Sequence, residues 1–396
     1  MAELEISICS GEPQAELQPI LDAYQTMNRV TVDLRFLDWS QAWTEFLQMT
    51  LYERGPVISE TGTTWMNSLA GRNSLRIFTR EEVRRMGGAG SYPRSIWESC
   101  VDPAAKDVVA IPWIVDTYLI YYRADLLAQA GVEETSAFST LDNFRSTLEK
   151  LQARGEIAPL ALPTAATLST MHNLASWIWG MGGEFVSREG NRLGLDTPEA
   201  REAILAFYNL IQFIPPSLRN LTDEECEAAF LKGECAVIVR NPSLLHLLKN
   251  QEAQPAFHQH IKTAVHPGVP LIGGSNLVIW KYIPPALESK AVDLIRYLTE
   301  VEAQTAYFEK SGNLPARLDA IQRISQDPDY APAFQSLIAG RDLPYIRLWG
   351  LIEDKLSRAF SDIWHNILYT PEPDIKRIVE DTLTPVERRL NITLSQ

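Results

Sequence analysis

The sequence lacks the features that define several broad protein classes. No apolar run approaches the roughly 20 residues that a helix needs to span a bilayer. Four cysteines in 396 residues, none in a C-x-x-C arrangement, are too few for a disulfide framework or a cysteine-based metal site. Lys and Arg number 36 against 50 Asp and Glu, and the resulting net charge of −14 disfavours nucleic acid and anionic membranes as partners.

Familiar catalytic and cofactor motifs are also missing. The chain has no G-x-S-x-G, no H-E-x-x-H, no G-x-x-x-x-G-K and no G-x-G-x-x-G after a strand. His258 and His260 form an H-x-H pair, but no carboxylate or cysteine stands at a helpful spacing, which favours a solvated loop. We therefore expect no catalytic residue, no metal and no cofactor.

The N-terminus and the cysteines leave alternatives open. Residues 1–5 have neither a basic region nor a long apolar stretch, so they are not a signal peptide. Either the protein is cytoplasmic, or it is a secreted protein whose signal segment was replaced by a start Met. Free cysteines are commonly buried and inert. Cys226 and Cys235 flank a short apolar segment and could be bridged or free.

Hydrophobic periodicity predicts alternating strands and helices. The strand-like segments are residues 4–8, 30–36, 57–58, 108–111, 119–122, 236–239 and 277–279. The helix-like segments are residues 14–27, 42–52, 143–152, 198–214 and 286–298. From residue 300 onward no clear strand is evident. The pattern predicts an α/β fold with a helical C-terminal portion.

Tryptophan is unusually abundant, because the chain contains 10 Trp, nearly as many as its 13 Phe and 13 Tyr. Four of them lie in surroundings that favour packing: Trp43, Trp97, Trp280 and Trp364. The other six lie with small polar groups near predicted strand ends and loops: Trp39, Trp65, Trp113, Trp177, Trp179 and Trp349. Ligands of open α/β sheets bind outside the strand carboxyl ends, so these six are candidate ligand-facing residues.

This composition suits a neutral sugar. A flat indole covers the apolar C–H face of a sugar ring with a large area at low entropic cost. Carboxylates and amides can hydrogen-bond to the hydroxyl rim. Such a ligand needs no basic patch, which the acidic balance permits.

Several segments match one family in order and spacing. Ile111-Pro112-Trp113 with Asp116-Thr117 is similar to a hinge-crossing signature, and residues 56–79 are similar to a strand, a ligand-facing loop, a Trp and a helix. The other matching segments are residues 141–144, 229–236, 273–276, 314–317 and 349–353. Over nearly its whole length, the chain resembles the extracellular solute-binding proteins of carbohydrate ABC transporters, the maltose-binding-protein-like family.

The resemblance implies a fold and a function. The fold is the two-lobed type II periplasmic-binding-protein fold, an α/β architecture with hinge strands and a ligand cleft between the lobes. We expect an N-lobe of residues 1–113 plus 264–312 and a C-lobe of residues 114–263 plus 313–396. Hinge closure would bury a sugar, oligosaccharide or glycoside, because only the closed state contacts it from both lobes. The closed monomer would then dock on the permease subunits of an ABC importer, as a periplasmic protein or cell-surface lipoprotein, without catalysis or direct membrane insertion.

The resemblance also implies site residues. Asp116 matches a position whose carboxylate bonds sugar hydroxyls, although it could instead cap the hinge. The remaining predicted ligand-binding residues are Glu12, Trp39, Thr63, Trp65, Trp113, His172, Trp177, Trp179, Arg240, Ser275, Asn276 and Trp349.

Three of these expectations are qualified. Arg240 could bond hydroxyls or pair with an acid, and His172 could simply lie on a helix face. Ser243 stands where the family often has a sugar-stacking Trp, so Trp349 or Trp179 would have to supply that surface.

Three other interpretations remain open. A carbohydrate-cleaving enzyme of the retaining type would need a second carboxylate about 5 Å from Asp116, for which Glu12 or Glu60 would have to approach it. A carbohydrate-sensing ectodomain would keep the lobes but report to a kinase or chemoreceptor. The ligand could also be a polyol, a sugar phosphate or an osmolyte glycoside.

Overall fold

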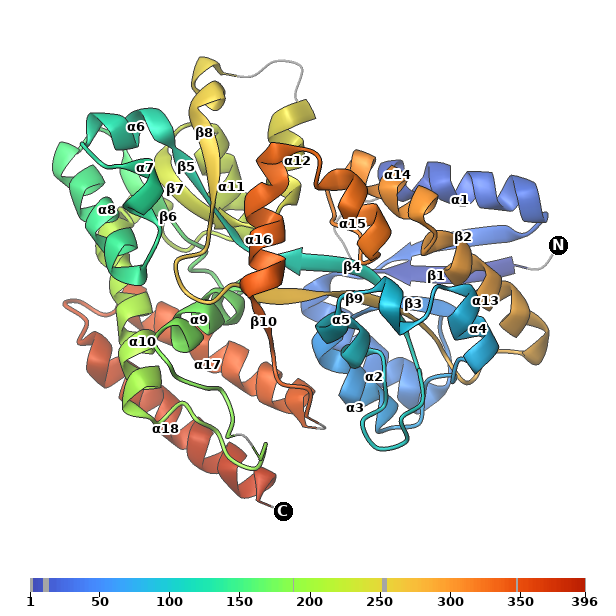
Figure 1. Ribbon diagram of the computed structural model, residues 1–396. Coiled ribbons are helices and arrows are strands. Elements are labelled where there is room, and N and C mark those ends of the chain that lie inside the picture. Colours follow the sequence, from blue (N-terminus) through green and yellow to red (C-terminus); the bar gives the residue numbers. More distant parts are fainter. Residues whose placement is uncertain (1–2, 10–13, 188, 251–254, 347, 396) are drawn as a thin grey trace. The chain divides into compact units, whose positions relative to one another are not determined.

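The computed structural model describes residues 3–9, 14–187, 189–250, 255–346 and 348–395 (Figure 1). The chain forms two compact units, each of which is described by itself. Unit 1 comprises Met1–Asp116, Gly273–Pro328 and Tyr345–Gly350. Unit 2 comprises Thr117–Ile272, Asp329–Pro344 and Leu351–Gln396. Both units combine a sheet with helices, so the predicted α/β class is confirmed.

Unit 1 is built on a mixed sheet. Its strands are β1 (Glu3–Ile8), β2 (Thr31–Phe36), β3 (Ile58–Gly62), β4 (Ile111–Thr117) and β9 (Leu271–Ile279), of which β4 and β9 extend into unit 2 at one end. β1 is parallel to both β2 and β3, whereas β9 is antiparallel to β3 and also pairs with β4. Leu4, Ile6 and Ile8 are fully buried, which explains the alternating pattern that predicted β1.

The order of these strands creates a switch point. β2 and β3 flank β1 on opposite sides, and the connections run through α1 (Gln14–Asn28) and α2 (Trp39–Tyr52). Right-handed crossovers in opposite directions place the two helices on opposite faces of the sheet, as Figure 1 shows. Ligands of open α/β sheets bind outside the strand carboxyl ends where the strand order reverses. In unit 1 this position lies between β1 and β3.

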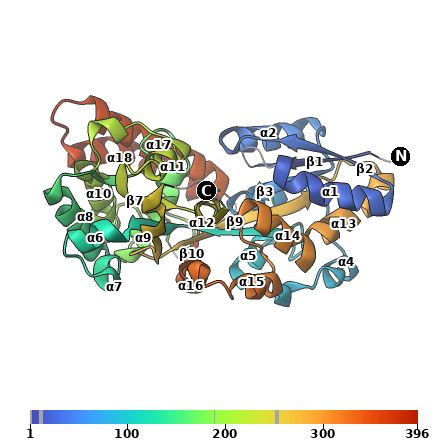
Figure 2. The same ribbon diagram turned by 90° about the horizontal axis from the view of Figure 1, so that it is seen from above.

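The remaining helices of unit 1 cover this sheet and its connections. They are η1 (Thr63–Trp65), α3 (Met66–Ala70), α4 (Arg80–Arg85), η2 (Ala89–Ser91), α5 (Arg94–Ser99), α13 (Pro285–Leu298), α14 (Val301–Ser311) and α15 (Leu318–Ile324). α1 packs against α13 and α14, although their sequences lie far apart (Figure 2). Thr79 forms a capping box with Glu82, which fixes the start of α4.

Unit 2 has a smaller sheet with the order β6 (Ala158–Ala161), β7 (Cys235–Arg240), β5 (Leu119–Arg123) and β8 (Ile261–Val265). β6 is parallel to β7, and β5 is antiparallel to both β7 and β8. Its helices before β8 are α6 (Ala124–Gln129), α7 (Glu134–Ala137), α8 (Leu141–Arg154), α9 (Ser169–Gly180), α10 (Pro198–Tyr208), η3 (Asn209–Phe213), η4 (Pro216–Leu218), α11 (Asp223–Leu231), α12 (Ser243–Asn250) and η5 (Ala256–His260).

The C-terminal portion is largely helical, as predicted. It contains η6 (Pro328–Tyr330), α16 (Ala331–Ala339), α17 (Trp349–Tyr369) and α18 (Ile375–Leu394). One detail was wrong, because β10 (Arg341–Asp342) forms a short parallel pairing with Leu271 and Ile272 of β9. A two-residue strand is defined by backbone pairing and leaves no side-chain period in the sequence.

The two units differ in their limits from the expected lobes. Residues 264–272 fall in unit 2, in part because β8 pairs with β5 as far as Val265. Residues 114–116, 313–328 and 345–350 fall in unit 1. Backbone bonds explain part of this, since Val115 N donates to Leu314 O at 3.0 Å and Ala316 N to Trp113 O at 3.1 Å.

Two further features complete the description. Cys9, Cys100, Cys226 and Cys235 are free and buried, so the alternative of a bridge between Cys226 and Cys235 does not hold in this structure. Among the helices of the described residues, none combines the length and the apolar character required to traverse a membrane.

Candidate ligand-binding site

The switch point of unit 1 carries buried polar groups at the ends of β1 and β3. The Cys9 amide, directly after β1, donates to Glu60 Oε2 at 2.7 Å, and the Cys9 thiol donates to the Glu60 carbonyl at 3.3 Å. Ser7 of β1 and Ser59 of β3, which are paired residues of the sheet, are also bonded, since Ser7 Oγ donates to Ser59 Oγ at 2.7 Å. These bonds tie the two strand ends together at the place where a ligand of such a sheet would bind.

Glu60 is the charged group of this edge. Its side chain belongs to β3 and is 2 % exposed. Burial raises the pKa of Glu60 to about 7, while the Ser275 hydroxyl and the Cys9 amide oppose the rise. The carboxyl therefore changes charge near neutral pH instead of standing as a fixed anion.

Two amide atoms beside this edge are buried and have no hydrogen-bond partner among the described residues. Asn276 Nδ2 donates to Ser99 Oγ at 2.9 Å, but Asn276 Oδ1 has no partner. Asn67 Nδ2, two residues after Trp65, has none either. Buried polar atoms are normally paired, so an unpaired acceptor and an unpaired donor suggest hydroxyl groups of a ligand.

An aromatic cluster adjoins the same strand ends. Trp65 lies at its centre, with ring centroids 5.5 Å from Trp39, 5.9 Å from Trp43 and 5.8 Å from Phe46. Trp39 is only half-buried, whereas Trp65 is buried. The cluster therefore combines a packed centre, Trp65, with a residue that is only partly buried, Trp39.

The pairing of β3 with β9 connects the aromatic cluster to the polar groups. A Cβ added to Gly62 would lie 3.5 Å from the Trp39 ring and 3.6 Å from the Trp65 ring. Gly62 itself pairs with Ser275, and Thr61 pairs with Asn276. The structure thus brings together five predicted ligand-binding residues, namely Trp39, Thr63, Trp65, Ser275 and Asn276.

The end of β4 lies against the same strand. Gly274 has φ +140°, and a Cβ there would lie 2.1 Å from the Ile114 carbonyl oxygen, so only glycine allows this approach. Asp116, two residues further along β4, is half-buried. Trp113 stacks on Tyr307 at 5.2 Å and 13° inside the core.

Trp349 and Glu12 complete the predicted set for this part of the chain. Trp349 is fully buried at the start of α17, and the neighbouring Gly350 packs closely on Ser68 and Trp43. Trp349 therefore stands beside the aromatic cluster as a packed side chain. Glu12 lies outside the described residues.

In unit 2, a predicted histidine and a tyrosine that sequence reasoning missed lie together. The Tyr118 hydroxyl is 3.3 Å from His172 Nδ1. Burial lowers the pKa of His172 to about 4, so the ring is neutral at physiological pH. The signal for Tyr118 was its place directly after Asp116-Thr117, within the hinge-crossing signature.

Arg240 is engaged by acids. Its guanidinium lies 3.1 Å from Asp223 Oδ1 and 2.9 Å from Glu227 Oε2, and Ser169 Oγ donates to Asp223 Oδ2 at 2.8 Å. Of the two alternatives for Arg240, the structure contains the ion pair. Its positive charge is neutralised within unit 2.

Trp177 and Trp179 do not lie at a loop, which corrects the expected placement. Both belong to α9, which continues to Gly180. Trp177 contacts the rings of Phe144 and Phe207 at 6.2 Å, in the core of unit 2. Trp179 contacts Phe185 and lies 5.0 Å from the Arg341 guanidinium. The glycine-rich sequence after Trp179 marks the end of this helix rather than a loop that holds both indoles.

The four tryptophans assigned to packing have aromatic contacts that agree with this assignment. Trp280 and Trp364 are fully buried, next to Phe46 and Tyr208 respectively. Trp97 stacks on Tyr92 at 5.7 Å, and Trp43 contacts Trp65.

Sequence comparison assigns the family. A profile of the family described as "Bacterial extracellular solute-binding protein" matches residues 20–335, which is most of the chain. The chain belongs to this family, whose members bind solutes and are not known for catalysis. The resemblance inferred from the sequence motifs is therefore confirmed.

Individual relatives are distant. A probable ABC transporter-binding protein of Deinococcus radiodurans is 25 % identical over 50 % of this chain and 48 % of its own length. The sn-glycerol-3-phosphate-binding periplasmic protein UgpB of Brucella abortus is 21 % identical over 61 % of this chain and 56 % of its own length. The chain thus spans about half the length of these curated relatives.

Solved structures share the fold. Maltose-bound MalE3 of T. maritima superposes with a TM-score of 0.84, at 18 % identity, over 98 % of this chain and all of the other. At this identity the likeness shows the two-lobed fold alone, and that fold expectation is confirmed.

Proposed function

We propose that this protein captures a neutral carbohydrate and delivers it to the permease of an ABC importer. Membership of the extracellular solute-binding family supports capture rather than catalysis. The maltose named for the similar structure, and the transporter named for the Deinococcus relative, support the ligand class and the partner.

The observation that carries the ligand class is the group of residues around the end of β3 in unit 1. There, Trp39 is only half-buried, while Asn276 Oδ1 and Asn67 Nδ2 are buried and have no hydrogen-bond partner within the described parts of the chain. An indole face together with an unpaired acceptor and donor matches the two surfaces of a sugar ring.

Charge favours a neutral ligand over the phosphate ester named for the Brucella relative. Among the predicted ligand-binding residues, Arg240 is the cation, and Asp223 and Glu227 neutralise it. A phosphate would compete with two carboxylates for this guanidinium, which costs binding free energy.

The wider context follows from the same proposal. Units 1 and 2 serve as the two lobes, and Asp116, at the end of β4, contributes its carboxylate to the ligand. Trp65, Thr63 and Ser275 shape the face of unit 1, and His172 contributes from unit 2. The protein acts outside the cytoplasm, as a periplasmic protein or a lipoprotein, after removal of a signal segment.

A thermal-shift screen tests the proposal, because a ligand that binds only the native state raises the melting temperature. The probes are maltose, other neutral sugars, polyols and sn-glycerol 3-phosphate. We expect a shift with at least one neutral carbohydrate, and we expect Asp116→Ala to lose most of it.

Asp142→Ala is the matched control, since Asp142 lies exposed in the first turn of α8. This variant should keep the full shift. A shift with sn-glycerol 3-phosphate, an amino acid or a polyamine, and with no carbohydrate, would overturn the ligand class.

A further inference from the structure

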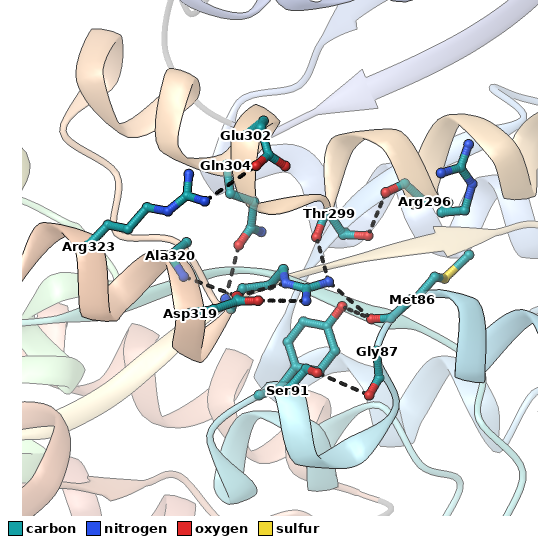
Figure 3. Close-up of polar contacts among 12 residues, drawn as sticks. Met86, Gly87, Ser91, Arg296, Thr299, Glu302, Gln304, Asp319, Ala320 and Arg323 are labelled. Carbon is teal, nitrogen blue, oxygen red and sulfur yellow. Dashed lines mark hydrogen bonds and ion pairs between the residues drawn. The ribbon is translucent and has the colours of Figure 1, made fainter.

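Gln304 is a buried amide of unit 1 that joins two segments far apart in the sequence. It belongs to α14 and is 2 % exposed. Gln304 Nε2 donates to the Trp113 carbonyl at 2.5 Å. Gln304 Oε1 accepts from the Arg317 amide at 3.0 Å (Figure 3). Both ends of the amide are therefore used, one on β4 and the other on the segment before α15.

The same face of α14 holds the ring of Trp113. Tyr307, three residues after Gln304, stacks on this indole at 5.2 Å and 13°. Residues three apart lie on one side of a helix. α14 thus fixes the backbone of Trp113 through Gln304 and its side chain through Tyr307.

The second segment is anchored from its other side by Arg317. The guanidinium donates two bonds of 2.9 Å to Asp319. It also donates to the carbonyls of Met86 and Thr299 at 3.4 Å each, as Figure 3 shows around these residues. Residues 314–317 therefore form a fixed support.

β4 is hydrogen-bonded to that support along its last residues. Val115 N donates to Leu314 O, and Ala316 N shares the Trp113 carbonyl with Gln304. Asp116 is the next residue after Val115 in the same strand. Asp116 therefore lies three residues from Trp113 along the same extended strand.

We propose that Gln304 is a positioning residue for ligand binding, because its amide fixes the end of β4 and with it the Asp116 carboxylate. This inference rests on the proposed function of Asp116. Without Gln304 the carboxylate samples more positions, and ordering it on binding costs affinity.

The main test compares ligand affinity in Gln304→Met and the wild type by isothermal titration calorimetry. The probe is maltose, or the sugar with the largest thermal shift. Methionine keeps the volume and removes both hydrogen bonds. We expect the Kd to rise about tenfold, which corresponds to roughly one net hydrogen bond.

The Gln304→Glu variant adds a second test, the pH dependence of ligand affinity. A residue that only stabilises the fold would leave this pH dependence unchanged. The introduced carboxyl still accepts from the Arg317 amide, but the ionised form places an oxygen against the Trp113 carbonyl. Protonation restores a donor, and burial raises a carboxyl pKa. The ratio of the variant Kd to the wild-type Kd should be large at pH 8.5 and fall towards one at pH 5.5.

Two ion pairs next to Gln304 are already formed, which limits their effect on this readout. Arg317 pairs with Asp319, and Glu302 pairs with Arg323. Gln322→Glu is the matched control, because it adds the same charge at an exposed position of α15. Its Kd should equal that of the wild type at both pH values.

The outcomes separate this inference from the proposed function. If the wild type binds no carbohydrate, the proposed function fails. If the wild type binds and folded Gln304→Met has the same Kd, the positioning role is overturned. If Gln304→Glu does not fold at pH 8.5, the comparison of Gln304→Met with the wild type decides alone.

Discussion

Units 1 and 2 use the same kinds of residue for different purposes. In unit 1, indoles gather at the end of β3, where Trp39 remains half-buried. Two buried amide atoms of this unit, Asn276 Oδ1 and Asn67 Nδ2, have no hydrogen-bond partner among the residues that the structure describes. In unit 2, Trp177 and Trp364 both contact Phe207 inside the core. An abundance of tryptophan therefore has two causes, a ligand-facing edge in one unit and aromatic packing in the other.

The buried charges differ in the same way. Glu60 of unit 1 is buried, and burial raises its pKa to about 7. Arg240 of unit 2 is held by two carboxylates. A titrating acid at a strand edge and a neutralised cation respond differently to pH and to mutation, and this contrast leads to the following predictions.

The largest expected effect is on the aromatic core of unit 2. Trp177→Ala should lower the free energy of unfolding by about 3–5 kcal/mol, because a large buried ring is replaced by a cavity. Denaturant unfolding measures this loss. A loss of unfolding free energy below about 1 kcal/mol would show that Trp177 is not a core residue. It would contradict the view that the tryptophans of unit 2 serve packing.

Removal of the neutralised cation comes next. Arg240→Met should destabilise the protein by about 3 kcal/mol, since Asp223 and Glu227 are left as partly buried, unpaired anions. The same unfolding experiment measures the loss. The destabilisation should shrink when the pH is lowered enough to protonate the two acids, and a loss independent of pH would contradict this origin.

The pH response of Glu60 is the third prediction. Its folded pKa lies above the ordinary value of 4.5, so the folded state binds the proton more tightly than the unfolded state. The contribution of Glu60 to the free energy of unfolding is fully present below about pH 4.5 and is lost as the pH rises through 7. Glu60→Gln should therefore gain up to about 3 kcal/mol relative to the wild type at pH 8 and little at pH 4.5.

The histidines of unit 2 act in the opposite direction. Burial lowers the pKa of His172 to about 4 and that of His266 to about 3. Their contribution is present above pH 6.5 and is lost as pH falls through 4. A stability profile of Glu60→Gln from pH 4 to 8 isolates the unit 1 contribution, and a profile parallel to that of the wild type would contradict the raised pKa.

The smallest stability effect is expected at Trp39. Trp39→Ala should cost about 1 kcal/mol, because this indole is only half-buried and its loss leaves the centre of the cluster in place. Ligand affinity should nevertheless fall at least tenfold in a calorimetric titration. Trp177→Ala should show the reverse pattern, a large loss of stability with little change in ligand affinity. If both variants lowered the affinity equally, the proposed difference between the two units would be wrong.

Much of the fold could be predicted because strands and helices impose different spacings on apolar residues, and these spacings are visible in the sequence. The alternation of apolar and polar residues in β1 is a local signal, and it appears in the structure. The boundary between the units was harder to predict. It depends on contacts such as the hydrogen bond from Val115 N to Leu314 O, which joins distant parts of the chain and leaves no local pattern.

The candidate site also has features that the sequence shows and features that it does not. Trp65, Ser275 and Asn276 were predicted as ligand-facing residues near strand ends and loops, and their role in binding stays a prediction. The structure places Trp65 after β3 and places Ser275 and Asn276 inside β9, which pairs with β3. The burial of Trp177 was not visible, since an indole before a glycine cluster has the same local sequence in a helix and in a loop.

Hydrogen exchange with and without ligand shows whether the sugar binds at the end of β3 in unit 1. The protein is saturated with the sugar that gives the largest thermal shift, and exchange is followed by mass spectrometry. We expect slower exchange in residues 60–70, which run from the end of β3 through α3 and include Trp65 and Asn67. Unchanged exchange in that segment, with protection confined to unit 2, would contradict this expectation.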